Sequence, residues 1–178
     1  PIEKETVLLM SDPVWYVGKS VPKGIMDEIS RWQSATNALV FVDGSFQYMP
    51  WTTVVDEASS RFDPARTVRL ICATKLVGIH GYRFSYTLLP DELKGDFSWT
   101  YTNINGSGTA DGLAFAHEAI AAIESREITN KLTNLAFERY HRACAGEKIR
   151  TVIEPDCGYF TFAEVLAPLP PNYPRVDG

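Results

Sequence analysis

An acid, an amine and a guanidinium lie at or near the ends of apolar segments that have the character of strands. Asp43 ends the run "LVFVD", Lys75 follows "VRLICA", and Arg83 stands eight residues after Lys75. Each has an ordinary explanation, as a turn former, a solvated rim charge or a surface ion-pair partner. Together they could hold a phosphorylated pyridine aldehyde, because an amine attacks a carbonyl carbon and a guanidinium binds phosphate through two parallel hydrogen bonds.

The elements that must position these groups begin with an apolar, β-branched run at 6–10, "TVLLM". The segment "KGIMDEISRWQSATN" then places Ile25, Ile29 and Trp32 at helical spacing, so we expect these three side chains to pack on a sheet. The run "ALVFVDG" follows. Strand, helix and strand in this order predict a right-handed parallel crossover.

Two more strands are predicted at 67–73, "TVRLICA", and at 82–89, "YRFSYTLL", with a possible helix around 52–62 before them. Continuous apolar strands indicate a sheet covered on both faces. The predicted fold class is therefore α/β, with a mainly parallel sheet and helices on both of its faces. Ligands of such sheets bind beyond the carboxyl ends of the strands, where Asp43 and Lys75 lie.

The second half of the chain predicts a small α+β lobe. Thr109 is a plausible N-cap of a helix at 109–125, and "REITNKLTNLAFERYHRACAG" predicts an amphipathic helix that ends at Gly146. The segments "KIRTVIE" and "GYFTFAEV" flank "PDCG", which suggests a β-hairpin. We therefore expect two parts, residues 1–105 and residues 106–178.

Composition excludes several classes of function. The chain has 178 residues, 45% of them hydrophobic, and a formal net charge of −5 with scattered Lys and Arg, so nucleic acid is not an expected partner. No apolar run approaches the roughly 20 residues of a membrane span. The first residues lack the pattern of a secretory signal. Cys72, Cys144 and Cys157 lack close CxxC or Cys/His spacing, so we expect reduced thiols, a cytoplasmic location and no metal site.

The segment around Lys75 resembles the signature of the fold-type I pyridoxal-phosphate enzymes, in particular the aminotransferase class I and II family. That signature has a small residue, the Schiff-base lysine, glycines three and six positions later, and an arginine at the eighth position. This chain has Thr74, Lys75, Gly78, Gly81 and Arg83 in that register. The two glycines would let the backbone turn tightly.

Two upstream segments fit the same family. "ALVFVDGSFQY" lies where the family has a strand ending in aspartate, here Asp43, and "SDPVWYVGKSV" lies where the family has Asn-Pro-x-Asn-Pro-Thr-Gly. Of that motif the chain keeps Pro13 and Gly18. Trp15 replaces the second asparagine and Phe46 stands where a tyrosine is common, so two side chains that usually bond the cofactor's phenolic oxygen are missing.

The resemblance implies pyridoxal 5'-phosphate as cofactor and an amino acid or amino-bearing metabolite as substrate. Lys75 would form the Schiff base and move the α-proton, and Asp43 would hold the pyridine nitrogen protonated. Arg83 would bind the phosphate, with the Thr74 hydroxyl beside it. Trp15 and Tyr48 are further candidates for contact with the cofactor. The full set of candidate cofactor-binding residues is thus Asp43, Thr74, Lys75, Arg83, Trp15 and Tyr48.

Family members are more than twice as long as this chain. The resemblance makes residues 1–105 the cofactor-binding part of a large domain and residues 106–178 part of a small domain. We expect a homodimer or a companion fragment, with "NINGSG" at 103–108 either reaching the neighbour's phosphate or merely connecting the two parts. Two functions stay open: an aminotransferase or related enzyme, and a degenerate noncatalytic interaction domain of the same fold.

Overall fold

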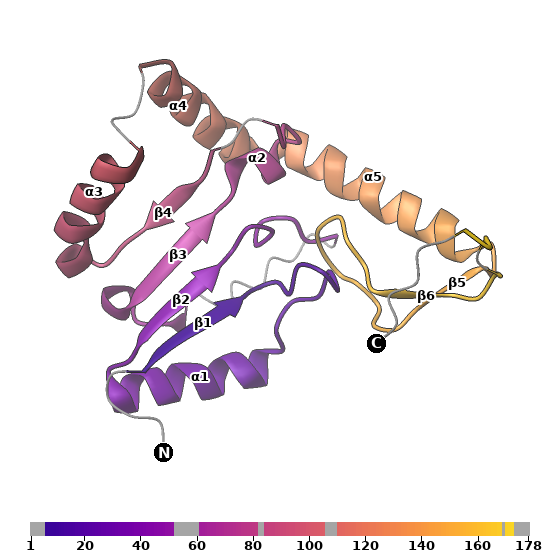
Figure 1. The fold of residues 1–178 in the computed structure, drawn as a ribbon, viewed down its shortest axis with the longest axis horizontal. Helices are drawn as coiled ribbons and strands as arrows, with labels where there is room; N and C mark the ends of the chain where they lie inside the picture. The colour runs from indigo at the N-terminus through magenta and orange to yellow at the C-terminus, as the bar shows by residue number, and fades with distance from the viewer. Residues whose placement is uncertain (1–5, 52–60, 82–83, 106–109, 169, 173–178) are drawn as a thin grey trace.

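The computed structural model describes residues 6–51, 61–81, 84–105, 110–168 and 170–172. Within them lie a four-stranded sheet and a separate two-stranded sheet. Figure 1 shows the larger sheet at one end of an elongated molecule and the smaller one at the other, with a long helix, α5 (Glu127–Cys144), running between them.

The larger sheet is mainly parallel, as predicted. Its strands lie in the order β1 (Val7–Ser11), β2 (Leu39–Asp43), β3 (Thr67–Ile71) and β4 (Tyr86–Leu88). β1 and β3 both pair in parallel with β2, whereas β4 is antiparallel to β3. β3 ends before the predicted residue 73 because a short helix, α2 (Ala73–Leu76), begins there. The possible helix around 52–62 falls mostly outside the described residues.

Helix α1 (Lys23–Thr36) covers one face of the sheet. Met26 is fully buried in a core with Val40 and Val42, and Ile29 and Trp32 pack against this core, as predicted for those two side chains. The prediction for Ile25 was wrong, since its side chain is 47% exposed. Successive helical residues are about 100° apart around the axis, so the buried face starts at the neighbouring methionine.

A buried glutamine joins α1 to the start of β3. Gln33 is 1% exposed, and its Nε2 donates to the Arg66 carbonyl at 2.9 Å and to Thr67 Oγ1 at 3.1 Å. Its Oε1 accepts from the Asp63 amide at 2.9 Å. Because both ends of the amide are hydrogen-bonded, the cost of removing this polar group from water is offset.

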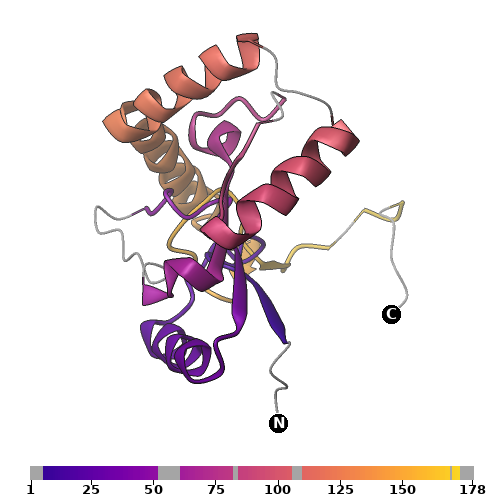
Figure 2. The ribbon, with the colours of Figure 1, turned by 90° about the vertical axis from the view of Figure 1, so that its left-hand side faces the viewer.

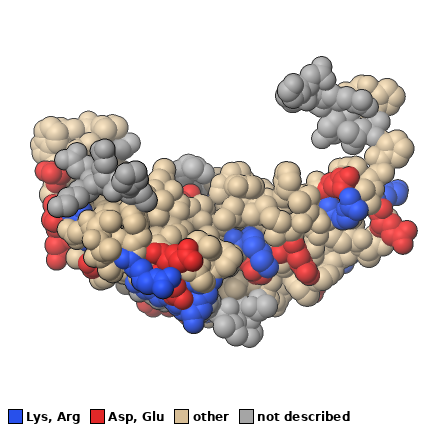
Figure 3. All heavy atoms as spheres, turned by 90° about the horizontal axis from the view of Figure 1, so that it is seen from below, with Lys and Arg blue, Asp and Glu red and all other residues tan. Residues whose placement is uncertain are grey.

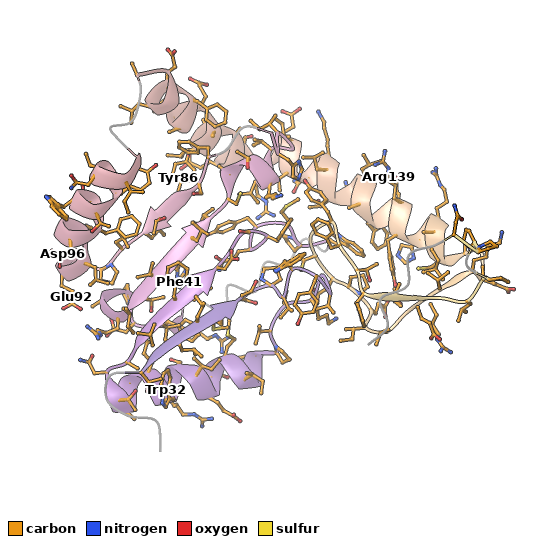
Figure 4. The ribbon with its side chains drawn as sticks, in the orientation of Figure 1. Trp32, Phe41, Tyr86, Glu92, Asp96 and Arg139 are labelled. Carbon is orange, nitrogen blue, oxygen red and sulfur yellow. The ribbon has the colours of Figure 1, made fainter. Side chains whose placement is uncertain are left out.

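Helix α3 (Asp91–Asn105) covers the opposite face, which confirms helices on both faces; Figure 2 shows α1 and α3 on the two sides of the sheet. Figure 4 marks Trp32 on α1, Phe41 on β2, and Glu92 and Asp96 on α3. Sequence reasoning missed α3. The expected loop at 103–108 is therefore wrong in part: Asn103–Asn105 end this helix, and 106–108 lie outside the described residues.

The two later helices were predicted correctly: α4 (Ala110–Ser125) and α5 follow each other. Thr109, the expected N-cap, is outside the described residues. The hydroxyl of Tyr86 on β4 donates to the Ala116 carbonyl on α4, which fixes α4 to the edge of the sheet (Figure 4).

The predicted hairpin forms as an antiparallel pair, β5 (Ile149–Thr151) and β6 (Ala163–Val165). The expected turn "PDCG" was wrong, because all of 152–162 connects the two strands. The backbone there bonds elsewhere: the amides of Asp156 and Cys157 donate to the carbonyl of Gly18, at 2.7 and 3.1 Å.

Charged side chains of both signs lie on the surface (Figure 3). On the face seen in Figure 3, basic and acidic side chains lie in small mixed groups without a continuous basic patch. Among the described residues, no helix is both long and apolar enough to cross a membrane, and no three His, Cys, Asp or Glu side chains are placed to hold a metal ion. Cys72, Cys144 and Cys157 are free thiols.

The register of α1 can be tested by truncating adjacent residues. Met26→Ala should lower the free energy of unfolding by about 2–5 kcal/mol, because it leaves a cavity in a closed core. Ile25→Ala should cost less than about 1 kcal/mol, because that side chain is already half exposed. Urea denaturation measures both, and equal losses would contradict this placement of the helix.

Candidate functional site

The candidate site lies at the carboxyl ends of the parallel strands. Ser11 at the end of β1 is opposite Asp43 at the end of β2, and Asp43 in turn is opposite Leu70 of β3. Two backbone bonds extend this alignment beyond the strands: the Asp12 amide donates to the Asp43 carbonyl at 3.1 Å, and the Gly44 amide donates to the Leu70 carbonyl at 2.8 Å. The loops that follow the three strands are therefore held side by side.

The loop after β1 is closed by a buried carboxylate. Asp12 is 4% exposed, and its Oδ1 accepts from the Val21 amide at 3.0 Å. Between these residues, Val14 and Lys19 form an antiparallel bridge. Trp15 and Tyr16 occupy the tip of this loop and remain about half exposed. The loop thus presents two aromatic side chains at the edge of the sheet.

Gly18 connects this loop to the segment 152–162. Its carbonyl accepts the amides of Asp156 and Cys157, and its φ is +63°. A Cβ at this position would lie 2.3 Å from the Phe160 carbonyl oxygen, so no larger residue fits without movement of the backbone. We call these two hydrogen bonds the Gly18 link. Around it, the Asp156 carboxylate pairs with Lys19 at 3.1 Å and accepts from the Ser20 amide at 3.0 Å.

Asp43 shapes the turn after β2. Its Oδ1 accepts from the Ser45 amide at 3.0 Å and from the Ser45 hydroxyl at 2.7 Å, so its role as a turn former is real. Among the described residues, no donor bonds its other oxygen, Oδ2, and no ion pair joins Asp43 to Lys75. The carboxylate is held in one orientation with one oxygen still able to accept a hydrogen bond.

Lys75 lies on α2, in the first helical turn after β3. Its Nζ is 5.9 Å from the centroid of the Phe46 ring, close enough for a cation–π contact, and the side chain is half buried. No acidic side chain within the described residues forms an ion pair with it. The backbone is fixed as well, since the hydroxyl of Tyr159 donates to the Lys75 carbonyl at 2.9 Å. The amine is thus positioned without being neutralised by a carboxylate.

The resemblance implied that the Thr74 hydroxyl is free to bind a phosphate and that the glycines after Lys75 allow tight turns. The structure differs between these residues. Thr74 is 1% exposed, and its hydroxyl lies 3.3 Å from the thiol of Cys72. Gly78 has a φ of +74° and packs against Leu132 of α5, so a tight turn does require a glycine there. Gly81 has no left-handed φ, and a Cβ added to it would have no neighbour within 4 Å among the described residues, so that expectation was wrong for Gly81.

Edge-to-face ring contacts lead from the Lys75 amine to the surface. The buried Phe46 contacts Tyr159 and Phe160, with centroids 6.0 and 5.8 Å apart, and Phe160 contacts Trp15 at 5.7 Å. Trp15 in turn contacts Tyr16 at 5.6 Å. We call these five side chains the ring cluster.

Sequence reasoning missed Tyr159 and Phe160. Tyr159 is 84 residues from Lys75 along the chain, and no local sequence pattern predicts a contact between them. Burial raises the pKa of Tyr159 to about 12, so its hydroxyl stays protonated and can donate to the Lys75 carbonyl at neutral pH. Burial also raises the pKa of the Cys157 thiol beside the Gly18 link.

Tyr48 and Arg83 are the remaining candidates. Tyr48 packs, partly buried, against the core formed by Phe46, Met49 and Leu76. Arg83 is among the residues that the structure does not describe. The structure therefore brings Asp43, Lys75 and Trp15 to one edge of the sheet, while Thr74 is turned into the interior.

Comparison with known proteins places this arrangement in a familiar fold. No protein-family model matches the sequence, and no curated protein matches it. Solved structures do. The chain is similar to a double mutant of aspartate aminotransferase from Thermus thermophilus, with a TM-score of 0.72 and 16% identity over 86% of this chain and 41% of that one. It is also similar to Bna3p of Saccharomyces cerevisiae, a candidate kynurenine aminotransferase, with a TM-score of 0.78 and 16% identity.

The Bna3p match covers 97% of this chain and 42% of the yeast protein. A third similar structure is a candidate aminotransferase from Clostridium difficile with pyridoxal phosphate bound, with a TM-score of 0.70 and 17% identity over 86% of this chain and 42% of that one. The chain thus has the fold of a part of the fold-type I aminotransferases. It spans about two fifths of the length of the solved structures that it matches.

The Gly18 link can be tested with a single methyl group. Gly18→Ala should lower the free energy of unfolding by about 2 kcal/mol or more, because alanine is strained at this φ and its Cβ meets the Phe160 carbonyl. Gly24→Ala is the matched control, since nothing lies within 4 Å of a Cβ there and alanine favours a helix by up to about 1 kcal/mol. Thermal and urea unfolding measure both changes in stability. Equal changes in the free energy of unfolding for the two variants would contradict the Gly18 link.

Proposed function

We propose that this chain carries the catalytic lysine of a pyridoxal-phosphate-dependent enzyme that acts on an amino acid or amino-bearing metabolite, most fittingly an aminotransferase. One observation carries the proposal: the Lys75 amine lies just beyond a parallel strand, half buried, against the ring of Phe46, with no carboxylate paired to it in the described part of the chain. The fold and the register of "TKLVGIHGYR" support the same assignment.

The side chains present fit this cofactor. Asp43 offers Oδ2 to a protonated ring nitrogen while Ser45 holds Oδ1, so binding requires no reorganisation of the turn. When bound, pyridoxal phosphate supplies an electron sink for the electron pair released as a bond to the substrate's α-carbon breaks.

The proposed roles follow from the chemistry of each group. Lys75 would hold the cofactor through its amine and, once that amine is free, would move the proton at the substrate's α-carbon. Asp43 keeps the ring nitrogen protonated. Arg83 binds the phosphate as a bidentate donor. Thr74 is 1% exposed, so its hydroxyl would have to become accessible before it could join Arg83.

Two aromatic side chains complete the proposed set. Trp15 is 47% exposed at the edge of the sheet, so its indole N–H can donate to the cofactor's ring oxygen in place of the missing asparagine. Tyr48 is the second candidate, through its hydroxyl, although its ring packs against the core beside Phe46.

The wider context is also proposed. Because the chain spans about two fifths of the solved aminotransferases, we propose that the competent enzyme is a homodimer or is completed by a companion polypeptide. The free thiols fit a cytoplasmic location. Neither nucleic acid nor a membrane is a proposed partner.

A noncatalytic interaction domain of the same fold is the second candidate. Phe46 favours it, because this buried ring lacks the hydroxyl that the family commonly places there. Burial of Thr74 favours it too. Under this alternative Lys75 would be a structural side chain that packs on Phe46, and the protein would form no covalent bond to the cofactor.

Covalent capture separates the two candidates. With pyridoxal phosphate added, the protein should absorb near the wavelengths of a lysine-bound cofactor, and borohydride followed by peptide mapping should place the label on Lys75. Lys75→Ala should abolish the absorbance and remain folded, because that side chain supports chemistry more than packing. Lys131→Ala, at an exposed lysine paired with Glu127 on α5, should keep both signals. Labelling of another lysine, or of none, would leave only the noncatalytic candidate.

Asp43 can be tested without disturbing its turn. Asn keeps an oxygen that accepts from Ser45, so Asp43→Asn should fold and retain the cofactor but exchange the substrate's α-proton at least about tenfold more slowly, since an amide cannot hold the ring nitrogen protonated. Asp63→Asn is the matched control, because Asp63 also caps a turn, accepting from the Ala65 amide at 2.9 Å. Proton exchange with solvent deuterium, followed by NMR, measures both. Undiminished exchange in Asp43→Asn would remove this residue from the mechanism.

A further inference from the structure

A cavity lies close to the segment that carries Lys75, and residues of α5 and of 152–162 line it. Its volume is about 590 Å³, within the range of about 300–1,000 Å³ common for small-molecule sites. Gly78 and Tyr159 line it, and the Tyr159 hydroxyl donates to the Lys75 carbonyl, so the cavity is close to the backbone of Lys75. None of the roles proposed above uses this space.

The aromatic walls of the cavity present ring surface, because their polar atoms are already bonded. Trp51 Nε1 donates to the Gly158 carbonyl at 2.9 Å, and the Tyr140 hydroxyl lies 3.2 Å from Thr151 Oγ1. The hydroxyl of Tyr159 donates to the Lys75 carbonyl. The three rings therefore contribute mainly apolar surface to the cavity lining. Tyr140 lies on α5, which also contributes the aliphatic side chains of Leu132 and Leu135.

The cavity has a basic side chain in its lining, although the chain as a whole has a negative net charge. The protein has 22 acidic and 17 basic residues, yet no Asp or Glu of the described residues lines this cavity, whereas Arg139, which Figure 4 marks on α5, is among the lining residues. Arg61, Arg66 and Arg150 each form an ion pair. In the part of the chain that the structure describes, no carboxylate pairs with Arg139. Its guanidinium is therefore available to an anion at an apolar, ring-lined cavity.

We infer that this cavity binds a small aromatic carboxylate, whose ring packs against the aromatic and aliphatic side chains that line the cavity while its carboxylate pairs with Arg139. A neutral aromatic ligand would leave the guanidinium unused. A small aliphatic acid would leave the ring surfaces uncovered, and aromatic pairs gain free energy beyond simple burial. Binding in this cavity does not depend on the proposed cofactor, because the cavity's walls are formed by the chain alone.

Cys144 provides a reporter of occupancy. It lines the cavity and is half buried, as is Cys72, which lies outside it, whereas Cys157 is buried. A ligand in the cavity should shield the Cys144 thiol from iodoacetamide and leave Cys72 as reactive as before. The rate of alkylation at each cysteine can be followed by mass spectrometry of its peptide, in the protein without added pyridoxal phosphate.

The test uses 3-phenylpropionate as ligand, with 3-phenylpropionamide as the ring without charge and propionate as the charge without ring. We expect 3-phenylpropionate to slow alkylation of Cys144 selectively and the two controls to protect much less at equal concentration. Arg139→Gln should raise the protecting concentration about tenfold, the loss of one charge-assisted hydrogen bond. Arg142→Gln, three residues further on the same helix and not in the cavity wall, should have no effect.

The inference is overturned if 3-phenylpropionate leaves the rate at Cys144 unchanged, slows Cys72 equally, or protects the Arg139→Gln variant as well as the unaltered protein. Calorimetric titration of the same ligands gives an independent measure of binding. Because all of these measurements are made without the cofactor, failure of the cavity and failure of Lys75 to bond pyridoxal phosphate would be seen separately.

Discussion

The two hydrogen bonds from the Asp156 and Cys157 amides to the Gly18 carbonyl join parts of the chain that are about 140 residues apart in sequence. They hold the loop after β1 against 152–162, and so bring Trp15 to Phe160 and Phe160 to Phe46, beside the Lys75 amine. A side chain at Gly18 would meet the Phe160 carbonyl at 2.3 Å. The geometry of the site and of the neighbouring cavity both depend on that close approach.

A lysine at such a site can serve chemistry only if its amine is held but not neutralised. The Phe46 ring attracts the ammonium form weakly and offers no proton acceptor, while the Tyr159 hydroxyl fixes the backbone rather than the amine. Asp43 is restrained by Ser45 and does not pair with Lys75. The acid and the amine thus stay unpaired at the carboxyl ends of two neighbouring parallel strands.

Local pattern was enough to predict the parallel strands, α1, α4 and α5, because each has a continuous apolar run or a helical stripe. It failed for α3, whose segment "DELKGDFSWTYTNIN" contains a glycine and several residues that favour strands. It also failed for Ile25, because Ile25 and Met26 are adjacent and apolar, so the sequence does not say which of them faces the core. The positions of Asp43 and Lys75 at or just after the ends of strands were predicted from the apolar runs before them. Tyr159, Phe160 and the Gly18 link were not, because contacts across more than 80 residues leave no local signal.

The central claim is that Lys75 bonds pyridoxal phosphate at this edge of the sheet. A crystal structure of the protein after incubation with the cofactor would test it most directly. We predict continuous electron density from Lys75 Nζ to the former aldehyde carbon, with the ring nitrogen within hydrogen-bond distance of Asp43 Oδ2. Cofactor density joined to a different lysine, or a Lys75 side chain still resting on Phe46 with no cofactor beside it, would contradict it.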